Sequence, residues 1–309
     1  MIYVSDRKGR TDGPAFQMLQ QVQSPLPIVL MAKTAGYRFN EELRNIKEPY
    51  ILCEFSEMGW DWKMEETHIW GKNTDKFPQF DSEHYKMFDE WVAENPPALT
   101  FTRELMQKDV TDTHKPIDYP CWFNVNDPVS EKEFNNRPLS SFYFWGRSHE
   151  ARVKLHGRMW TEGTEKGFSI CDNLAFFDKF MLNEDGRKIV SVHLPHYYRV
   201  DIKELLAINN LSKTCIALPG AGIKTFRHVE ASYNSVMIKW ADGLAWSYPW
   251  QPGKNCITTP EGDEIEWLIW SLDTLNLYTI YKAGVANCKN YQIDLYIKNY
   301  IEPIIKSVA

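Results

Sequence analysis

Short continuous apolar runs recur through the first half of the chain, with helical or irregular segments between them. The runs cover residues 2–5, 27–32, 50–55 and 98–102. Apolar runs without alternation fit strands that are buried on both faces, as in a parallel sheet. Helices are expected at 13–23, where Pro14 suits a first turn, and at 84–95. Residues 59–80 show little periodicity and are expected to form a long loop at the edge of the sheet.

A polar segment at 124–138 interrupts this pattern. It contains two prolines and four asparagines, which is typical of a linker. We therefore expect an N-terminal domain over residues 1–135 and a C-terminal domain over 136–309, with the last helix free to pack back on the first domain.

The alternation of strands and helices resumes after the linker. Strands are expected at 141–145, 188–192, 214–218 and 235–239. Helices are expected at 149–160, 201–211, 225–234, 264–282 and, with a weaker pattern, 291–308. Two successive α/β alternations of similar size predict two Rossmann-like domains that face each other across a cleft.

Composition narrows the class of protein. The 309 residues are 43% hydrophobic and 25% charged, which is ordinary for a globular protein. No apolar run approaches the roughly 20 residues that span a bilayer, and no secretory leader opens the chain, so we expect a cytoplasmic protein. The net charge of −6 argues against a surface that binds nucleic acid throughout, although a local basic groove is compatible with it.

The six cysteines are scattered and none form a Cys-x-x-Cys pair. We therefore expect reduced thiols, with no zinc site and no disulfide framework.

The segment from Leu218 to Ala231 carries the strongest chemical signal. An apolar strand ends, two glycines follow (Gly220 and Gly222), and a helix then begins. Glycines let the backbone approach a ligand, and the start of a helix favours anions. On the helix, Arg227 and Glu230 are three residues apart and share a face. An arginine suits phosphate and a carboxylate suits a ribose diol, so the segment favours a nucleotide diphosphate.

Other interpretations of this segment stay open. Most glycine-containing strand-to-helix turns bind nothing, and a spacing of three also permits a salt bridge within the helix. The spacing matches neither the dinucleotide-binding fingerprint nor a Walker A loop.

A second turn, Gly146-Arg147-Ser148, also follows a strand and precedes a helix. Loops at the carboxyl ends of parallel strands line the ligand crevice of α/β proteins. Arg147, Lys224 and Arg227 are therefore expected to converge on one polyanion together with backbone amides. For Arg147, a surface ion pair is the equal alternative.

These features together resemble a known family. Residues 212–220 read Ser-Lys-Thr-Cys-Ile-Ala-Leu-Pro-Gly, and 222–231 read Gly-Ile-Lys-Thr-Phe-Arg-His-Val-Glu-Ala. With the earlier strand, turn and helix, this order resembles the donor-binding half of GT-B glycosyltransferases, most closely the exostosin-type branch. The resemblance covers about 141–256, and the first half of the chain matches in architecture alone.

The resemblance implies a role for each matching residue. Glu230 would hold the ribose of the donor, and Arg227 would hold its diphosphate. The loop positions that it implies are Gly220, Gly222, Lys224 and Thr225, and the second turn adds Gly146 and Arg147 as expected donor-binding residues. Thr225-Phe226 stands where the family has a serine, and Ile238 stands where many retaining members have a second glutamate, so the stereochemical outcome stays open.

The expected activity is that of a hexosyl- or pentosyltransferase. It would use a nucleotide-diphosphate sugar such as a UDP-sugar as co-substrate, with no further cofactor. The chain has no clear Asp-x-Asp at a strand end, so we expect no metal.

The first half is then expected to bind the acceptor and, in an inverting enzyme, to supply a general base. Asp12 follows the first strand and is the candidate base, although it also suits a helix cap. Glu54, Glu57 and Asp61 are its rivals.

The acceptor can be a glycan, a small molecule or a hydroxymethylated base in DNA. The DNA alternative requires a local basic cleft, which four residues would line: Arg7, Lys8, Arg10 and Lys33. A protein that binds nucleotides or sugars without catalysis is the third interpretation.

Overall fold

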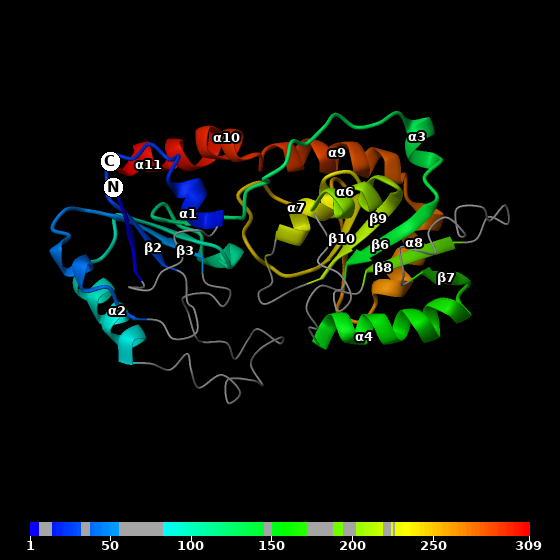
Figure 1. Cartoon of the computed structure of the whole chain (residues 1–309), viewed down its shortest axis with the longest axis horizontal. Coiled ribbons are helices and arrows are strands. Elements are labelled where there is room, and N and C mark those ends of the chain that lie inside the picture. The colour runs from blue at the N-terminus through cyan, green and yellow to red at the C-terminus, as the bar shows by residue number, and fades with distance from the viewer. Residues whose placement is uncertain are drawn as a thin grey trace. The chain divides into compact units, whose positions relative to one another are not determined.

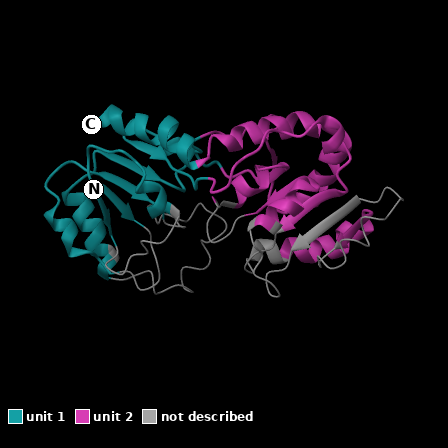
Figure 2. Ribbon diagram, turned by 45° about the horizontal axis from the view of Figure 1, so that its top comes forward, with its two compact units in different colours: residues 1–120, 243–247, 293–309 teal, residues 121–242, 248–292 magenta. Residues whose placement is uncertain are grey.

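The structure is a computed structural model, and it describes residues 1–5, 14–31, 38–55, 83–144, 150–171, 188–193, 202–218, 224 and 226–309. The chain divides into two compact units (Figure 2). Unit 1 comprises Met1–Pro120, Gly243–Ser247 and Ile293–Ala309, and unit 2 comprises Cys121–Asp242 and Tyr248–Gln292. The chain therefore passes between the units four times.

Unit 1 contains a sheet of five parallel strands in the order β1-β2-β3-β4-β5. The strands are β1 (Ile2–Val4), β2 (Ile28–Met31), β3 (Ile51–Glu54), β4 (Leu99–Thr102) and β5 (His114–Pro116). The first four confirm the apolar runs, and β2 and β3 are buried along their whole length. The short strand β5 was not expected from the sequence.

Helices cover both faces of this sheet (Figure 1). They are α1 (Pro14–Leu19), η1 (Glu41–Asn45), α2 (Glu83–Glu94), η4 (Gln107–Asp109), α10 (Ile293–Tyr296), η7 (Ile297–Ile301) and α11 (Glu302–Val308). Figure 1 shows α2 on one side of the strands and α1, α10 and α11 on the other. Aromatic residues of α2, Phe88 and Trp91, pack with Val29 and Leu52 in one buried cluster. The expected helix at 13–23 ends early, at Leu19.

Unit 2 contains six parallel strands in the order β11-β10-β9-β6-β8-β7. The strands are β6 (Leu139–Phe144), β7 (Phe168–Cys171), β8 (Lys188–His193), β9 (Ser212–Ala217), β10 (Val236–Trp240) and β11 (Ile257–Thr259). Four of them confirm expected strands, and the two edge strands, β7 and β11, were not expected. The two parallel sheets confirm the predicted α/β class.

The helices of unit 2 also lie on both faces of its sheet. They are α3 (Glu131–Asn135), α4 (Glu150–Arg158), η5 (Met159–Gly163), α6 (Ile202–Asn210), α7 (Phe226–Ser232), α8 (Glu264–Thr274) and α9 (Leu277–Lys289). Figure 1 shows α4 on one side of the strands, with α6, α7 and α9 on the other. Helix α3 lies inside the expected linker, where Ser130 and Glu133 form a capping box.

The single helix expected at 264–282 is wrong, because the structure has two helices there. Leu275 is extended at the end of α8, and the side chain of Asn276 then accepts a hydrogen bond from the amide of Thr279 at 3.1 Å. This cap starts α9 as a new helix. The expected helical segment at 291–308 is confirmed as α10, η7 and α11. Within the described part of the chain, no helix combines the length and the apolar character needed to cross a bilayer.

Candidate functional site

The order of strands in unit 2 marks one place at its carboxyl edge. From β6 the chain continues toward β7 and β8, whereas from β9 it continues in the opposite direction toward β10. Strands β6 and β9 are parallel neighbours, with Tyr143 opposite Ile216. The point where neighbouring connections diverge is where open α/β sheets form their ligand crevice, outside the carboxyl ends of the strands. Here those ends lead into residues 145–149 and 218–225.

The structure describes part of the predicted donor segment. Strand β9 is buried apart from Lys213, and Leu218 behind it is also buried. Lys224 is 1% exposed. Helix α7 then packs on β9 and β10, with Val229 and Ala231 buried. The apolar residues on either side of the turn therefore fix the start of α7 next to the end of β9.

Arg227 and Glu230 form an ion pair on α7. Their side chains are 19% and 11% exposed. Burial lowers the pKa of the Arg227 guanidinium, while the charge and the hydrogen bond of Glu230 act in the opposite direction. The salt bridge within the helix, which was the alternative interpretation of this spacing, is thus present. It also holds one guanidinium and one carboxylate together near the divergence of β6 and β9, and their role toward a donor stays a prediction.

Six of the predicted site residues lie outside the described residues: Asp12, Gly146, Arg147, Gly220, Gly222 and Thr225. The expected convergence of Arg147 with Lys224 and Arg227 also stays a prediction. The pairing of β6 with β9 does bring together the two strands that precede these turns.

A second ion pair at the carboxyl edge of unit 2 was not expected from the sequence. Lys239 of β10 donates to the carboxylate of Asp242 at 2.7 Å and to the carbonyl of Trp240 at 2.8 Å. Both side chains are less than one tenth exposed. Lys239 lies opposite Ala217 of β9, so this pair occupies the strand next to the donor segment. A lysine inside an apolar strand is the sequence signal that could have pointed to it.

The aromatic residues after Gly243 show packing rather than an open stacking surface. The ring of Trp250 stacks on Tyr291 at a centroid distance of 5.8 Å, and Tyr248 contacts the same ring edge-on at 5.5 Å. Tyr291 is fully buried.

The amino edge of the unit 2 sheet carries a separate polar network around Arg137. Its guanidinium lies between the rings of Phe134 and Tyr281, at 4.7 and 4.9 Å from their centroids. It donates to the carbonyl of Ser212 at 2.9 Å and to the side-chain oxygen of Asn234 at 3.1 Å. These two oxygens lie at strand starts, and the hydroxyl of Tyr281 also accepts from Arg137 at 3.5 Å, so the network joins structural elements.

In unit 1, every buried polar or charged residue among those described lies at the carboxyl edge of the sheet. They are Ser5, Glu54, Thr102, Arg103 and Asp118. Burial of polar groups costs free energy, so their gathering at one edge marks it as the polar region of this unit.

Arg103 contacts several other residues at this edge. Its guanidinium donates to the hydroxyl of Tyr119 at 2.6 Å and lies 5.1 Å from the centre of that ring. It also pairs with Glu104 at 3.4 Å, and its amide donates to the carbonyl of Glu54 at 3.0 Å. Glu54 is the last residue of β3 and is fully buried, so one of the predicted rivals of Asp12 lies at the carboxyl edge.

Comparison with known proteins shows likeness in structure alone. No protein-family model and no curated protein matches the chain. The solved structure of HepE from Anabaena in complex with UDP matches with a TM-score of 0.52 at 12% identity, over 95% of this chain and 81% of that one. HepE in complex with UDP and glucose matches with a TM-score of 0.50 at 12% identity, over 91% and 78%. TarM matches with a TM-score of 0.50 at 8% identity, over 95% of this chain but 57% of TarM.

These likenesses establish the fold. HepE and TarM are GT-B glycosyltransferases, and the chain shares their architecture of two Rossmann-like α/β domains. The chain spans little more than half the length of TarM. At such low identity, activity and substrates do not follow from the likeness.

Proposed function

We propose that this protein is a glycosyltransferase that moves a sugar from a nucleotide-diphosphate sugar to an acceptor hydroxyl without a metal. The observation that carries the proposal is the Arg227–Glu230 pair on α7, close to where the connections of β6 and β9 diverge. The likeness to HepE, which was solved with UDP, supports a UDP-sugar as the donor. The exostosin-like character of the donor segment and the transfer of a hexose or pentose belong to the same proposal.

The two side chains of the pair suit the two halves of a nucleoside diphosphate. A guanidinium binds phosphate oxygens through two parallel hydrogen bonds. A carboxylate accepts two hydrogen bonds from a ribose diol. Because Glu230 already holds Arg227, the guanidinium is oriented before the donor arrives, which lowers the entropy cost of binding.

Positive groups would stabilise the leaving diphosphate in place of a metal ion. Lys224 and Arg227 supply two charges, and we propose Arg147 as the third, with the amides of Gly220, Gly222 and Thr225 and the approach allowed by Gly146 completing the site. As the bond from the sugar to the diphosphate breaks, negative charge grows on the departing oxygen. Oriented donors at that oxygen lower the barrier more than water does.

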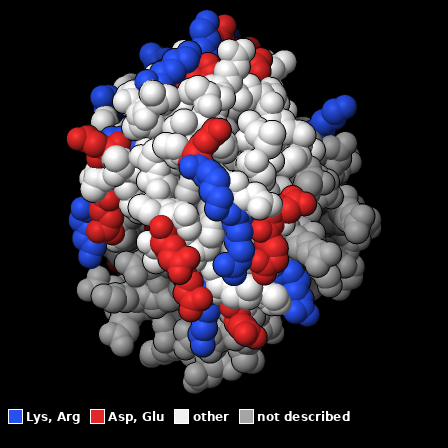
Figure 3. Space-filling model, turned by 90° about the vertical axis from the view of Figure 1, so that its left-hand side faces the viewer, with Lys and Arg blue, Asp and Glu red and all other residues white. Residues whose placement is uncertain are grey.

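We propose that unit 1 binds the acceptor and that Asp12 is its candidate base, with Glu54, Glu57 and Asp61 as rivals. Of these four carboxylates, only Glu54 lies among the described residues. Among the described residues at or beside this edge, three carboxylates, Glu54, Glu104 and Asp118, lie near the single guanidinium of Arg103. Figure 3 shows basic and acidic side chains interspersed on one face of unit 1. The described carboxylates favour a glycan or small-molecule acceptor over DNA, which requires several basic contacts. The four basic residues of the DNA alternative, Arg7, Lys8, Arg10 and Lys33, lie outside the described residues.

UDP binding tests the donor site directly. We expect Arg227→Ala and Glu230→Gln each to weaken the affinity for UDP by about 10- to 100-fold in calorimetric titration, the cost of losing one or two charge-assisted hydrogen bonds. Arg158→Ala is the matched control, because Arg158 is also held by glutamates, including Glu162 on the following turn, but lies at the end of α4. Unchanged UDP affinity in both α7 variants would contradict the donor assignment.

Activity separates the enzyme from a binding protein without catalysis. Purified protein incubated with a panel of UDP-sugars should release UDP slowly by transfer to water, and faster with an accepted glycan. Asp12→Asn and Glu54→Gln then decide between the two carboxylates. The variant of the true base should lose about 100-fold or more in turnover while its UDP affinity stays unchanged. UDP binding without any UDP release across the panel would instead favour the binding protein.

A further inference from the structure

Two cysteines far apart in sequence lie next to each other where the chain enters and leaves unit 2. Cys121 is the first residue of unit 2, and its amide donates to the carbonyl of Tyr291 at 2.6 Å. It also forms a parallel bridge with Gln292, the last residue of unit 2. The amide of Tyr291 donates to the carbonyl of Cys288 at 3.0 Å, in the last turn of α9. The backbone thus fixes Cys121 beside the end of α9.

The two thiols meet in the interior. The two side chains lie close enough for each thiol to affect the other, and Cys121 and Cys288 are 3% and 0% exposed. Around them, the Cys121 thiol donates to the carbonyl of Phe123 at 3.0 Å, and the Cys288 thiol donates to the carbonyl of Val229 in α7 at 3.4 Å. The Cys288 sulfur therefore lies against the helix that carries Arg227 and Glu230.

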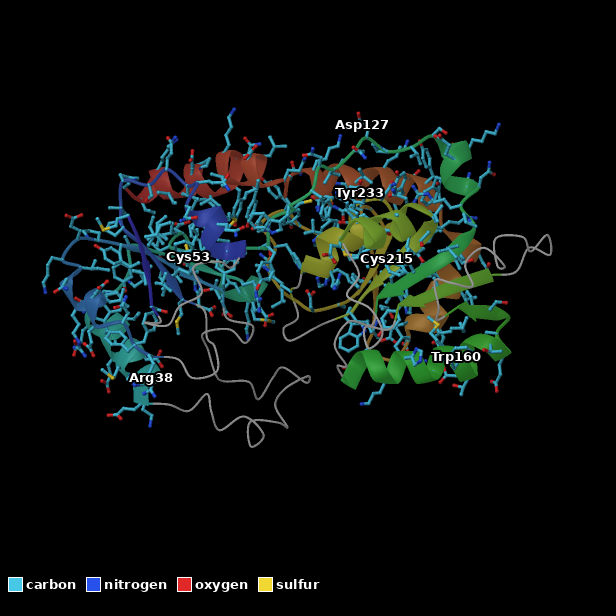
Figure 4. The ribbon with its side chains drawn as sticks, in the orientation of Figure 1. Arg38, Cys53, Asp127, Trp160, Cys215 and Tyr233 are labelled. Carbon is cyan, nitrogen blue, oxygen red and sulfur yellow. The ribbon has the colours of Figure 1, made fainter. Side chains whose placement is uncertain are left out.

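The other described thiols are placed differently. Cys53 belongs to β3 of unit 1, and Cys215 belongs to β9 of unit 2 (Figure 4). Cys256 precedes β11, and burial raises the pKa of its thiol, with smaller and opposed effects of Lys239 and Asp242. Among the thiols that the structure describes, Cys121 and Cys288 are thus the pair whose surroundings bring two sulfurs together.

We propose that Cys121 and Cys288 are a site of reversible disulfide formation that joins the two ends of unit 2. With oxidised glutathione as the oxidant, a thiolate of one cysteine attacks the glutathione disulfide and releases one glutathione thiolate. The second cysteine then attacks the protein sulfur of this mixed disulfide and releases the other. The net change converts two protein thiols and one glutathione disulfide into one protein disulfide and two glutathione thiols.

Burial sets when this exchange takes place. Burial raises the pKa of the Cys121 thiol, and its contact with Cys288 raises it further, so little thiolate exists in the folded protein. Exchange therefore requires that the end of α9 opens, or that the chain folds under oxidising conditions. Once formed, the disulfide removes the thiol donor from the carbonyl of Val229 and closes a long loop, which restricts the unfolded chain.

Refolding in glutathione buffers tests the proposal. The full chain is unfolded, refolded in equal concentrations of reduced and oxidised glutathione, blocked with N-ethylmaleimide and mapped by peptide mass spectrometry. We expect a Cys121–Cys288 disulfide in most molecules, with Cys53, Cys215 and Cys256 alkylated after denaturation. We also expect the melting temperature of unit 2 to rise by roughly 5–10 °C relative to the reduced protein.

Single variants complete the test. Cys121→Ser and Cys288→Ser should abolish the rise in melting temperature, whereas Cys53→Ser, a buried cysteine of unit 1, should leave it intact. If either serine variant fails to fold, the map of the unaltered chain decides alone. Free Cys121 and Cys288 in most oxidised molecules, or a disulfide between other cysteines, would overturn the proposal.

Discussion

The two sheets are both parallel, yet they differ in the direction in which the chain builds them. In unit 1 the strands follow one another in sequence order, so every connection between described strands runs the same way. In unit 2 the chain starts at a central strand, β6, builds one side, and then crosses to β9 on the other. Only the second arrangement creates a point of divergence, and the predicted donor segment follows a strand at that point. The strand order therefore favours unit 2 as the unit that binds the donor.

Buried polar residues distinguish the sheets in a second way. Those of unit 1 lie at the carboxyl edge, as at Glu54 and Arg103. Those of unit 2 lie at both edges, with Arg137 at the amino edge and Glu230 and Lys239 toward the carboxyl edge. A polar network at an amino edge serves the fold, whereas one at a carboxyl edge is also placed for a ligand. The comparison thus indicates a structural role for Arg137, whereas a ligand role for Glu230 stays a prediction.

The largest expected effect concerns the amino edge of unit 2. Arg137→Met should lower the free energy of unfolding of this unit by about 3–5 kcal/mol, because it removes the hydrogen bonds that the guanidinium donates to the carbonyl of Ser212 and to the side chain of Asn234. Urea denaturation measures the loss. The UDP affinity of the protein that remains folded should be unchanged. A large loss of UDP affinity with normal stability would reverse the assignment of this edge.

The next effect sharpens the role of the carboxyl edge. Arg227→Ala removes the guanidinium that pairs with the largely buried carboxylate of Glu230, so it should cost both stability and UDP affinity. The double variant Arg227→Ala/Glu230→Gln should regain about 1–2 kcal/mol of stability, because it removes that charge, while UDP affinity stays low. Urea denaturation and calorimetry on the same samples separate the two quantities. Recovery of UDP affinity in the double variant would show that the pair is purely structural.

A pair of glycines tests how tightly unit 2 is packed around its sheet. A Cβ at position 284 in α9 would lie 2.9 Å from the carbonyl oxygen of Asn255, whereas one at position 157 in α4 would meet nothing within 4 Å. Gly284→Ala should therefore destabilise the unit by about 1–3 kcal/mol. Gly157→Ala should stabilise it by about 0.5–1 kcal/mol, because alanine favours helix. Thermal unfolding of both proteins gives the comparison, and equal effects would show that α9 can move away from Asn255.

The sequence predicted the interior of each sheet and missed strands at the edges. The three strands that it missed, β5, β7 and β11, are all edge strands. An edge strand has one neighbour and needs no continuous apolar run, so His114–Pro116 and Ile257–Thr259 carry little local signal. Central strands such as β9 and β10 are buried on both faces, and their composition alone identifies them.

For the site, the sequence predicts contacts between neighbouring residues better than contacts between distant ones. The ion pair of Arg227 with Glu230 follows from helical spacing and was open to prediction. Arg137 meets Tyr281 across 144 residues, and Cys121 meets Cys288 across a similar stretch, so neither contact leaves a pattern in the sequence. Such partners can be identified only once the order of the strands in the sheet is known.

The smallest expected effect lies at the carboxyl edge of unit 1 and depends on pH. Thr102 and the Nε2 atom of His114 are hydrogen-bonded at 2.8 Å, and burial lowers the pKa of His114 while the charge of Asp109 opposes that shift. Near the ordinary histidine pKa of about 6.5, the folded protein then binds fewer protons than the unfolded chain. The contribution of neutral His114 to the free energy of unfolding is therefore present above that pH and is lost as pH falls toward the lowered pKa. Urea unfolding of the protein and of His114→Asn between pH 7.5 and 5 should show a steeper decline for the unaltered chain. Parallel pH profiles would mean that His114 takes up a proton as readily in the folded protein as in the unfolded chain. The carboxyl edge of unit 1 would then be more solvated than the edge of unit 2 that carries Lys239.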